Sequence, residues 1–545
     1  TAAELNLLDG VTALGASSVN GLSDGLVEQN SIWIGNDPSG ATNGAQYNVA
    51  VGTTALDAIT TGDKNTAMGF NSMTDNTTGS NNTAYGAYSL YENTTGDKNQ
   101  SFGYQSLNNN TTGSDNTALG YQSLYSNTTG TRNLAIGYSA YDNADTENDN
   151  LAIGYWALGG AIDGGEYNVA IGNYSLGANT TGDYNVAVGY NSLTGNTTGN
   201  YVTAIGGKAL QANTTGTGNT AVGTNAMESN TTGASNTVMG WNALVTNTTG
   251  SNNLAMGVNT MFYNTTGYKN VALGDYGLWA NTEGMENVAI SGNGSLYKNT
   301  TGSQNIAIGA ASLYNNETGN YNIAIGRSSL YSNTASNNVG IGHESLKSNT
   351  TGSSNTASGY RSLYANTTGN NNTATGSASL VSNTTGNNNT ASGREALHRN
   401  TTGNFNTATG RHSLYFNTEG EYNTGTGYGT LYSNTTGSKN TAIGFNSLFA
   451  NTEAYNNTAL GFYAGDGITT GNNNVMLGYG TDPSAVDGTN QIVIGKDATG
   501  QADHSVVLGN ANVTAVYASQ DAGATVYAGG LNLGGTAVTA TAAEL

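Results

Sequence analysis

The sequence predicts an all-β fold, a parallel β-solenoid whose coils form a flattened roll with two short strands in each coil. Three observations predict it. A glycine recurs every 17 residues over most of the chain, the residues between the glycines repeat one pattern, and only 2 of the 545 residues are proline. Because proline has no N–H to donate, its scarcity suits strands that must hydrogen-bond on both sides.

The repeat is a unit of 17 residues that we number from its first asparagine. In most units position 1 is Asn, position 3 is Ala, position 4 is apolar, position 5 is Gly, position 9 is Leu or Met, and positions 12 to 15 read Asn-Thr-Thr-Gly. The unit occurs 27 times between Gly35 and Gly478 when Ser291 is counted in place of a glycine. Seventeen residues are too few for a pair of helices, and the short apolar runs suit strands.

Two turns are expected to close each coil. The tetrads Asn93–Gly96 and Asn110–Gly113 have turn composition, because Asn hydrogen-bonds its own backbone and tolerates left-handed geometry, and Gly adopts positive φ without a steric clash. The glycine at position 5 makes the other corner. If the coils stack about 4.8 Å apart, the array is a rod on the order of 130 Å long.

The residues at positions 3 and 9 are predicted to fill the interior with one small and one large side chain from each coil. These core residues include Leu90, Leu107, Leu124, Leu176, Leu193, Leu210, Ala67, Ala84 and Ala118. The asparagines at position 1 are expected to stack as a buried amide ladder, formed by Asn48, Asn65, Asn82, Asn99 and Asn116 and broken once at Val202.

Position 4 indicates an interface. It is apolar along much of the chain and becomes Ser or Thr from Ser358 to Thr426. Because monomers rarely expose a long apolar stripe to water, we interpret it as a contact between copies of the chain and expect a homotrimer closed about the rod axis.

Four segments are predicted: an N-terminal connector (1–25), the repeat shaft (26–480), an irregular β cap (481–520) and a C-terminal connector (521–545). Since Thr1–Leu5 and Thr541–Leu545 are identical, we expect a segment of a longer fibre chain flanked by neighbouring modules.

Composition argues against several functions. With 35 acidic and 14 basic residues, the net charge of −21 opposes binding to nucleic acid. The sequence contains no cysteine for thiol or disulfide chemistry. Its apolar runs fall far short of the roughly 18 residues that a membrane helix needs, so no membrane insertion is expected in this segment. No cofactor is expected either.

Particular units resemble known families. Asn133–Gly137, Asn168–Gly172 and Asn305–Gly309 read Asn-x-Ala-Ile-Gly and resemble the β-roll heads of trimeric autotransporter adhesins, whose repeat is shorter. The full unit is more similar to phage tail-fibre proteins with arrays of Asn-Thr-Ala-Ile-Gly repeats. Thr1–Thr12 resembles the connector repeat of marine phage fibres, and Ser505–Gly509 followed by Val516–Ser519 resembles the segment that closes such arrays.

The resemblance implies a non-enzymatic, structural and adhesive fibre shaft in a virion tail fibre. Such a shaft presents or forms a host-receptor-binding element, whose partner would be a host-surface glycan or protein. A trimeric adhesin on a bacterial cell surface is the alternative. A glycan-processing tailspike is a further one, and it would need a pair of carboxylates in a groove.

Few residues suggest chemistry. The sequence offers no catalytic constellation, and we interpret His343, His398, His412 and His504 as solvated surface side chains. Asp142, Asp145, Glu147 and Asp149 gather four carboxylates in one irregular turn. A calcium site is one interpretation of this turn, and a solvated acidic loop is the one we favour.

Tyrosines recur at two positions, one coil apart. The rings are expected to stack along the solenoid, and exposed rows also suit contact with a glycan. The rows are Tyr104, Tyr121, Tyr138 and Tyr155 at position 6, and Tyr297, Tyr314 and Tyr331 at position 10. The Asn-Thr-Thr tripeptides match glycosylation acceptors, although their place in a turn explains them without sugar.

Overall fold

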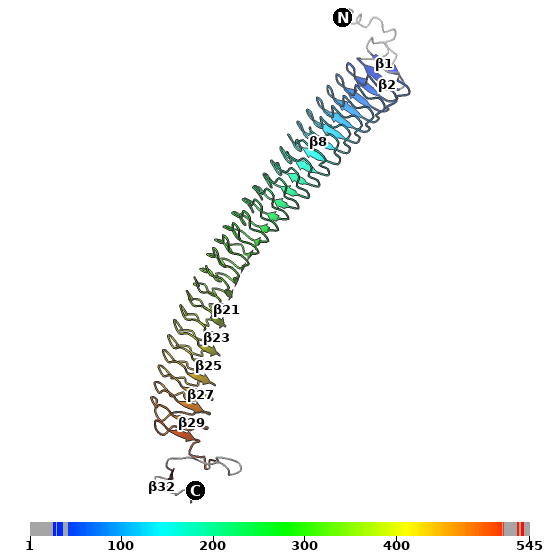
Figure 1. The fold of residues 1–545 in the computed structure, drawn as a ribbon. Helices are drawn as coiled ribbons and strands as arrows, with labels where there is room; N and C mark the ends of the chain where they lie inside the picture. Colours follow the sequence, from blue (N-terminus) through cyan, green and yellow to red (C-terminus); the bar gives the residue numbers. More distant parts are fainter. Residues whose placement is uncertain are drawn as a thin grey trace, which may run out of the picture. The chain divides into compact units, whose positions relative to one another are not determined.

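The computed structural model describes residues 25–28, 30–35, 42–514, 516, 531–533 and 536–538 (Figure 1). It divides into two compact units, Thr1–Tyr360 (unit 1) and Arg361–Leu545 (unit 2), which we describe separately. The connectors predicted for 1–25 and 521–545 lie almost entirely outside the described residues.

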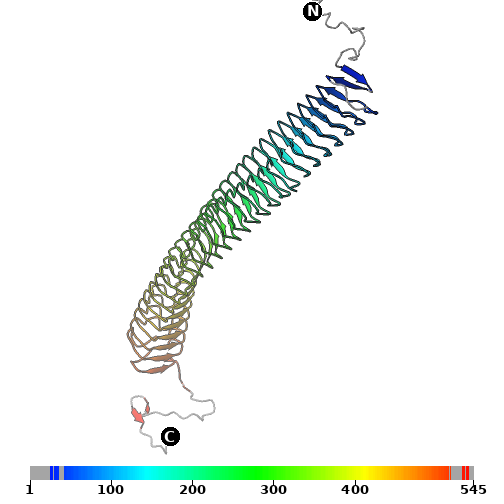
Figure 2. The same ribbon diagram turned by 45° about the horizontal axis from the view of Figure 1, so that its top comes forward.

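Unit 1 is a parallel β-solenoid, which confirms the predicted fold class. Strand β1 (Gly25–Glu28) pairs antiparallel with β2 (Ser31–Ile34), and from β2 onward each strand pairs in parallel with the strand of the next coil. Figures 1 and 2 show these strands lying one above another. The strands after β2 are β3 (Val49–Val51), β4 (Thr66–Met68), β5 (Thr83–Tyr85), β6 (Gln100–Phe102), β7 (Thr117–Leu119), β8 (Leu134–Ile136), β9 (Leu151–Ile153), β10 (Val169–Ile171), β11 (Val186–Val188), β12 (Thr203–Ile205), β13 (Thr220–Val222), β14 (Thr237–Met239), β15 (Leu254–Met256), β16 (Val271–Leu273), β17 (Val288–Ile290), β18 (Ile306–Ile308), β19 (Ile323–Ile325), β20 (Val339–Ile341) and β21 (Thr356–Ser358).

Unit 2 repeats the same architecture. Its parallel strands are β22 (Thr373–Thr375), β23 (Thr390–Ser392), β24 (Thr407–Thr409), β25 (Thr424–Thr426), β26 (Thr441–Ile443), β27 (Thr458–Leu460), β28 (Val475–Leu477), β29 (Ile492–Ile494) and β30 (Val506–Leu508). Strands β29 and β30 lie in the segment expected to form an irregular cap, and they continue the parallel pairing. A separate antiparallel pair follows, β31 (Leu531–Leu533) with β32 (Thr536–Val538).

Each coil holds one strand, so the prediction of two strands per coil is wrong for the described residues. The strand occupies positions 2 to 4, and the second apolar piece is a series of turns in which positions 7 and 9 have positive φ, as at Gln122 (52°) and Leu124 (51°). The physical reason is that Ser123 and Leu124 are both buried. Adjacent residues of a strand point to opposite faces, so a strand could not bury both.

These turns still hydrogen-bond to neighbouring coils. The Gln122 N–H donates to the Tyr104 carbonyl of the preceding coil at 2.9 Å, whereas the Leu124 N–H donates to the Ala140 carbonyl of the following coil at 3.1 Å. The left-handed leucine costs roughly 1–2 kcal/mol, and burial of its side chain returns about 1.5–3 kcal/mol. The alternation therefore satisfies the backbone while placing leucine inside.

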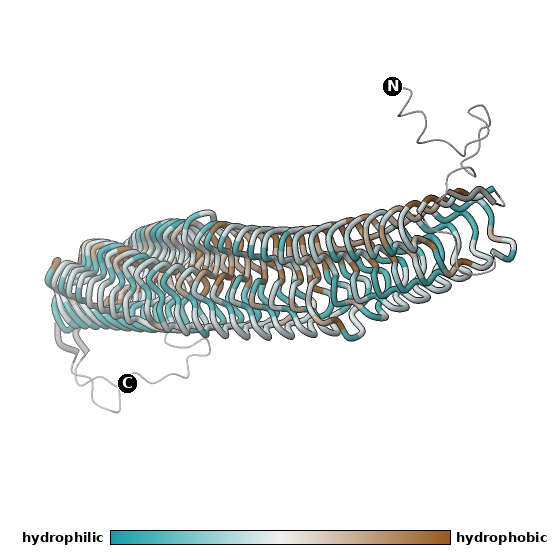
Figure 3. The backbone as a smooth tube through the Cα atoms, turned by 90° about the horizontal axis from the view of Figure 1, so that it is seen from above, coloured by the Kyte–Doolittle hydropathy of each residue, from teal (hydrophilic) through white to brown (hydrophobic). Residues whose placement is uncertain are grey.

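The interior holds more residues than the sequence predicted. The leucines at position 9 and alanines at position 3 that were predicted as core are fully buried. The position 1 asparagines are buried as predicted, for example Asn116. Asn at position 12, Ser or Ala at position 8 and Gly at position 15 join them in most coils, for example Asn127, Ser123 and Gly130. Figure 3 shows apolar residues in brown recurring at the same place in successive coils near the N-terminus. The interior is therefore a mixture of aliphatic and amide columns.

The two recurring glycines serve different purposes. Gly120 at position 5 has a φ of +142°, as the corner interpretation requires. Gly113 at position 15 is not among the residues with positive φ, so the predicted reason for that glycine is wrong. A Cβ there would lie 2.4 Å from both the Asn110 Oδ1 and the Gly130 carbonyl oxygen of the next coil. Position 15 is glycine because the stacked coils leave no room for a side chain.

Among the residues that the structure describes, no helix is long and apolar enough to cross a membrane.

Candidate functional surfaces and ladders

The asparagines at position 1 form a ladder through the backbone of the neighbouring coil. Asn116 accepts a hydrogen bond on Oδ1 from the Asn133 N–H at 2.9 Å and donates from Nδ2 to the Gly130 carbonyl at 2.7 Å. The predicted members Asn48, Asn65, Asn82 and Asn99 make the same two contacts. In these coils the amides bond to backbone groups and not to one another, so the ladder differs in chemistry from the expected amide stack.

A second ladder, which sequence reasoning missed, runs along position 12. Asn110 donates from Nδ2 to the Asn93 Oδ1 of the preceding coil at 2.7 Å and to the Gly113 carbonyl of its own turn at 3.0 Å. The next residue adds a hydroxyl ladder, since the Thr111 hydroxyl donates to the Thr128 carbonyl at 3.0 Å. The turn tetrad thus links coils as well as reversing the chain. The recurrence of its asparagine every 17 residues was the available signal.

The burial of position 12 also bears on glycosylation. Asn93 and Asn110 head Asn-Thr-Thr tripeptides, yet both side chains are fully buried and both Nδ2 groups donate hydrogen bonds. A sugar on either nitrogen would require the coil to open.

The position 12 ladder is interrupted where three residues change together. In one coil Tyr141 replaces the leucine of position 9, Ala144 replaces the asparagine of position 12, and Glu147 replaces the glycine of position 15. In most other coils the position 12 amide occupies the space that a position 15 Cβ would need, so a side chain at one position requires a smaller residue at the other. The Tyr141 hydroxyl accepts a hydrogen bond from Asn150 Nδ2 at 2.6 Å.

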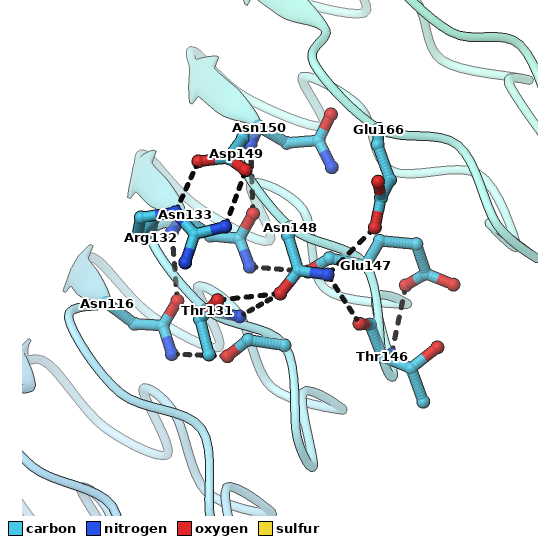
Figure 4. A network of polar contacts seen from close by, with 11 residues as sticks. Asn116, Thr131, Arg132, Asn133, Thr146, Glu147, Asn148, Asp149, Asn150 and Glu166 are labelled. Atoms are coloured by element: carbon cyan, nitrogen blue, oxygen red, sulfur yellow. Dashed lines mark hydrogen bonds and ion pairs between the residues drawn. The ribbon is translucent and has the colours of Figure 1, made fainter.

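The four carboxylates of this turn have separate partners, and Figure 4 shows those of Glu147 and Asp149. Glu147 is only 3% exposed and accepts backbone hydrogen bonds from Asp145, Thr146 and Gly164 at 3.0–3.2 Å. Asp149 pairs with both nitrogens of the Arg132 fork at 2.6 and 2.7 Å, which holds the pKa of Asp149 below its usual range.

Asp142 accepts a hydrogen bond from Asn143 at 3.1 Å, and Asp145 accepts one from the Thr128 hydroxyl. Over the described residues no group of three or more His, Cys, Asp or Glu side chains could hold a metal ion. The favoured interpretation of a solvated acidic loop is wrong for Glu147, which caps the turn from inside.

The tyrosines of position 6 stack along the outside of unit 1. The ring centroids of Tyr104, Tyr121, Tyr138 and Tyr155 are 4.9–5.4 Å apart with interplanar angles of 8–20°. Those of Tyr297, Tyr314 and Tyr331 at position 10 are 5.0 and 5.2 Å apart. Stacked rings cover one another's faces, so a glycan would meet mainly ring edges and hydroxyls. Contact with a glycan stays a prediction.

Sequence reasoning missed further stacks with the same spacing. Tyr167, Tyr184 and Tyr201 stack at position 17 of unit 1, at 4.9 and 5.3 Å. In unit 2, Tyr428, Phe445, Phe462 and Tyr479 stack at position 6, at 4.9–5.4 Å.

The histidines have defined neighbours rather than solvent alone. His412 in unit 2 is half-buried, and its Nε2 lies 2.6 Å from the Glu395 carboxylate. Burial opposes ionisation of Glu395, but hydrogen bonds from His412 and Arg394 outweigh it and lower the pKa of Glu395. His398 stacks on Tyr415 at 4.7 Å, and burial lowers the pKa of His398.

Of the other two histidines, His343 in unit 1 is exposed and stacks on Tyr360, and His504 is exposed beside Asn490.

A pair of carboxyls lies near the C-terminal coils of unit 2. Asp466 and Asp482 share a hydrogen bond, and Asp482 also accepts one from the Gly467 N–H at 3.1 Å. Burial, together with the neighbouring Asp466, raises the pKa of Asp482 to about 6. Asp482 borders a cavity of about 210 Å³ that is also lined by Pro483 and Val486.

Comparison with models of known protein families gives no match, and comparison with curated proteins gives none either.

Proposed function

We propose that the chain is a non-enzymatic structural shaft of a phage tail fibre, which holds or forms an adhesive element for host attachment. The observation that carries the proposal is that its repeated side chains make contacts between successive coils. The asparagines of positions 1 and 12, the threonine of position 13 and the stacked tyrosines all bond one coil to the next. Such contacts between neighbouring repeats are what stabilise a long solenoid.

Length follows directly from this construction. Unit 1 contains the twenty strands β2–β21, which span roughly 90 Å at about 4.8 Å per coil. The antiparallel β1 covers the N-terminal edge of that stack, and a covered edge is one means of preventing uncontrolled strand addition. A chain built from one repeated unit can therefore hold an attachment element at a distance with little variety in its sequence.

A trimeric adhesin on a bacterial surface would use the same architecture and stays the alternative. The place where the protein is found distinguishes the phage fibre from the bacterial adhesin. Antibodies raised against the purified chain would label tail fibres of intact virions under the first proposal, and would label intact bacterial cells under the second.

A glycan-processing tailspike receives less support. Glycosidases hold their two carboxyl groups about 5–9.5 Å apart, whereas Asp466 and Asp482 are close enough to share a hydrogen bond. Purified chain should therefore leave bacterial surface polysaccharides at their original length. Depolymerisation that an Asp482→Asn variant abolishes would refute the shaft proposal, and electron micrographs without elongated particles would refute it independently.

A further inference from the structure

We propose that the outer face of the sheet in unit 1 packs against the same face of other copies of this chain. The proposal rests on the shaft function above, whose partner it names. It concerns the position 4 side chains of β2–β20, which we call the apolar stripe: Ile34, Val51, Met68, Tyr85, Phe102, Leu119, Ile136, Ile153, Ile171, Val188, Ile205, Val222, Met239, Met256, Leu273, Ile290, Ile308, Ile325 and Ile341.

The stripe is continuous because the strands pair in register. Val51 lies opposite Met68, Met68 opposite Tyr85, and the same correspondence leads to Ile325 opposite Ile341. All nineteen positions are apolar. The neighbouring residues of position 3, which are alanine in most coils, are buried, so the position 4 side chains must point outward. The sheet thus has an aliphatic surface on both sides.

Eight of the nineteen outward side chains are exposed and the other eleven are half-buried. Leu119 is 47% exposed and Met239 48%. Position 2 lies on the same face and is also aliphatic in many coils, including Leu134, Val169 and Ile306. Neither position carries a charged residue anywhere in β2–β20, although the whole chain has a net charge of −21. Charge has been kept off this face.

The area is large enough for a stable interface. Tyr85 is 46% exposed, which corresponds to about 70–115 Å² for an aromatic side chain. If the other positions expose about half as much, nineteen coils supply on the order of 650–1,100 Å², against the 300–600 Å² of the largest patch on a typical monomer. A standard interface buries about 800 Å² per partner. The stripe alone supplies an area of that order.

The repeat itself identifies the occupant. A partner must offer a narrow apolar surface of the same length and spacing, and another copy of unit 1 supplies that surface by construction. The same patch on each copy can then meet itself around a symmetry axis, as closed homo-oligomers do. Since the stripe follows the stacking direction of the coils, copies would lie side by side along it.

Unit 2 provides an internal comparison. The position 4 residues of β22–β25 are Thr375, Ser392, Thr409 and Thr426, and all four are exposed. Hydroxyl groups stay hydrated at no cost, so this part of the sheet does not need a partner. Substitutions there are matched controls for substitutions in the stripe.

The first test is the mass of the full chain in solution. Multi-angle light scattering at micromolar concentration should give two or three times the 55.4 kDa of one chain, and a mass of one chain would overturn the proposal. Raising the salt concentration should strengthen association, because it screens repulsion between the acidic copies.

Paired substitutions test the surface. Ile205→Asp combined with Met239→Asp should raise the dissociation constant at least ten-fold, whereas Thr375→Asp with Thr409→Asp should leave it unchanged. Circular dichroism checks that both variants keep their sheet signal. Oligomers that resist the first pair, or that are lost equally with the second, would overturn the proposal.

Cross-linking tests the same point without disturbing the fold. The chain has no native cysteine, so Ile205→Cys introduces a single thiol on the stripe. Mild oxidation should join copies of this variant, while Thr198→Cys on an exposed turn of the preceding coil should remain uncross-linked. Elongated particles that are monomeric and do not cross-link would refute this interface while leaving the shaft proposal intact.

Discussion

Val202 stands at position 1 of its coil, where the neighbouring coils carry asparagine. Its contact with the preceding coil is kept, because the Val202 N–H donates to the Asn185 Oδ1 at 3.0 Å. The following coil does lose a contact, because valine offers no acceptor to the Asn219 N–H. The carbonyl of Gly216 keeps the donor from Asn213 at 3.0 Å but lacks the one that a position 1 amide would supply. Val202→Asn should restore both contacts.

The expected gain follows from these two contacts. Leaving the buried Asn219 N–H without an acceptor costs about 1–3 kcal/mol, and one additional hydrogen bond to Gly216 contributes about 0.5–1.5 kcal/mol. Loss of the buried valine side chain takes back about 1.5–3 kcal/mol. The net stabilisation is about 1 kcal/mol, and the reverse substitution Asn116→Val should cost a similar amount.

Native-state hydrogen exchange measures this effect locally, which suits a repeat protein whose coils open in part. In the unaltered chain the Asn219 amide should exchange faster than the Asn236 amide, which donates to the Asn219 Oδ1 at 3.0 Å. Val202→Asn should slow exchange at Asn219 by about five-fold. Equal protection of both amides in the unaltered chain, or a variant that unfolds at lower urea concentration, would refute the reasoning.

Three further predictions concern other contacts. Gly113→Ala should destabilise unit 1 by about 3 kcal/mol in urea unfolding because its Cβ meets oxygens at 2.4 Å, while Gly207→Ala, with no atom within 4 Å, should gain about 0.4–1 kcal/mol; equal midpoints would contradict this. Leu124→Asp should cost 4 kcal/mol or more by the same assay, whereas Thr129→Asp on the exposed turn should change stability by about 0.5 kcal/mol or less. Asp482 has a raised pKa of about 6, so the folded state binds the extra proton and unit 2 should lose stability as pH rises from about 4 through 6. Allowing for solvent screening, the loss is at most about 1–2 kcal/mol, and Asp482→Asn should remove this pH dependence in urea titrations at pH 4 and pH 7.

The repeat length and the alternation around Ala118 were sufficient to predict the stacking of coils and the parallel register. A 17-residue period with a buried small residue leaves few other arrangements for so short a unit. The second strand could not be excluded by periodicity, because an apolar run of three residues fits a strand or a turn. The adjacent Ser123 and Leu124 held the clue, since a strand cannot bury two neighbours on one side.

The turn tetrad illustrates a different limit. The spacing shows that Gly113 must be glycine, but it does not show whether the reason is a left-handed backbone or a lack of space. The structure decides between the two, because a Cβ built on Gly113 would lie too close to the Asn110 Oδ1. The chemistry of the asparagine columns was equally hidden. Asn116 bonds to the Gly130 carbonyl of its own coil and to the Asn133 N–H of the next, whereas Asn110 bonds to the Asn93 side chain. Yet both asparagines recur with the same period. The prediction that the acidic turn is solvated was wrong for Glu147. In this coil Ala144 replaces the asparagine of position 12 and leaves room inside for the Glu147 side chain at position 15.

The nearest-neighbour bonding of the coils has a genetic consequence. Each coil offers the next coil the same hydrogen-bonding groups that it meets in the preceding one. The Asn116 N–H donates to the Asn99 Oδ1, and the Asn133 N–H donates to the Asn116 Oδ1. Excising or duplicating one whole repeat in frame would rejoin equivalent surfaces, so unequal recombination between repeats could shorten or lengthen the protein without a folding penalty. The irregular coil around Tyr141, Ala144 and Glu147 is an exception, because its three substitutions must be inherited as a block.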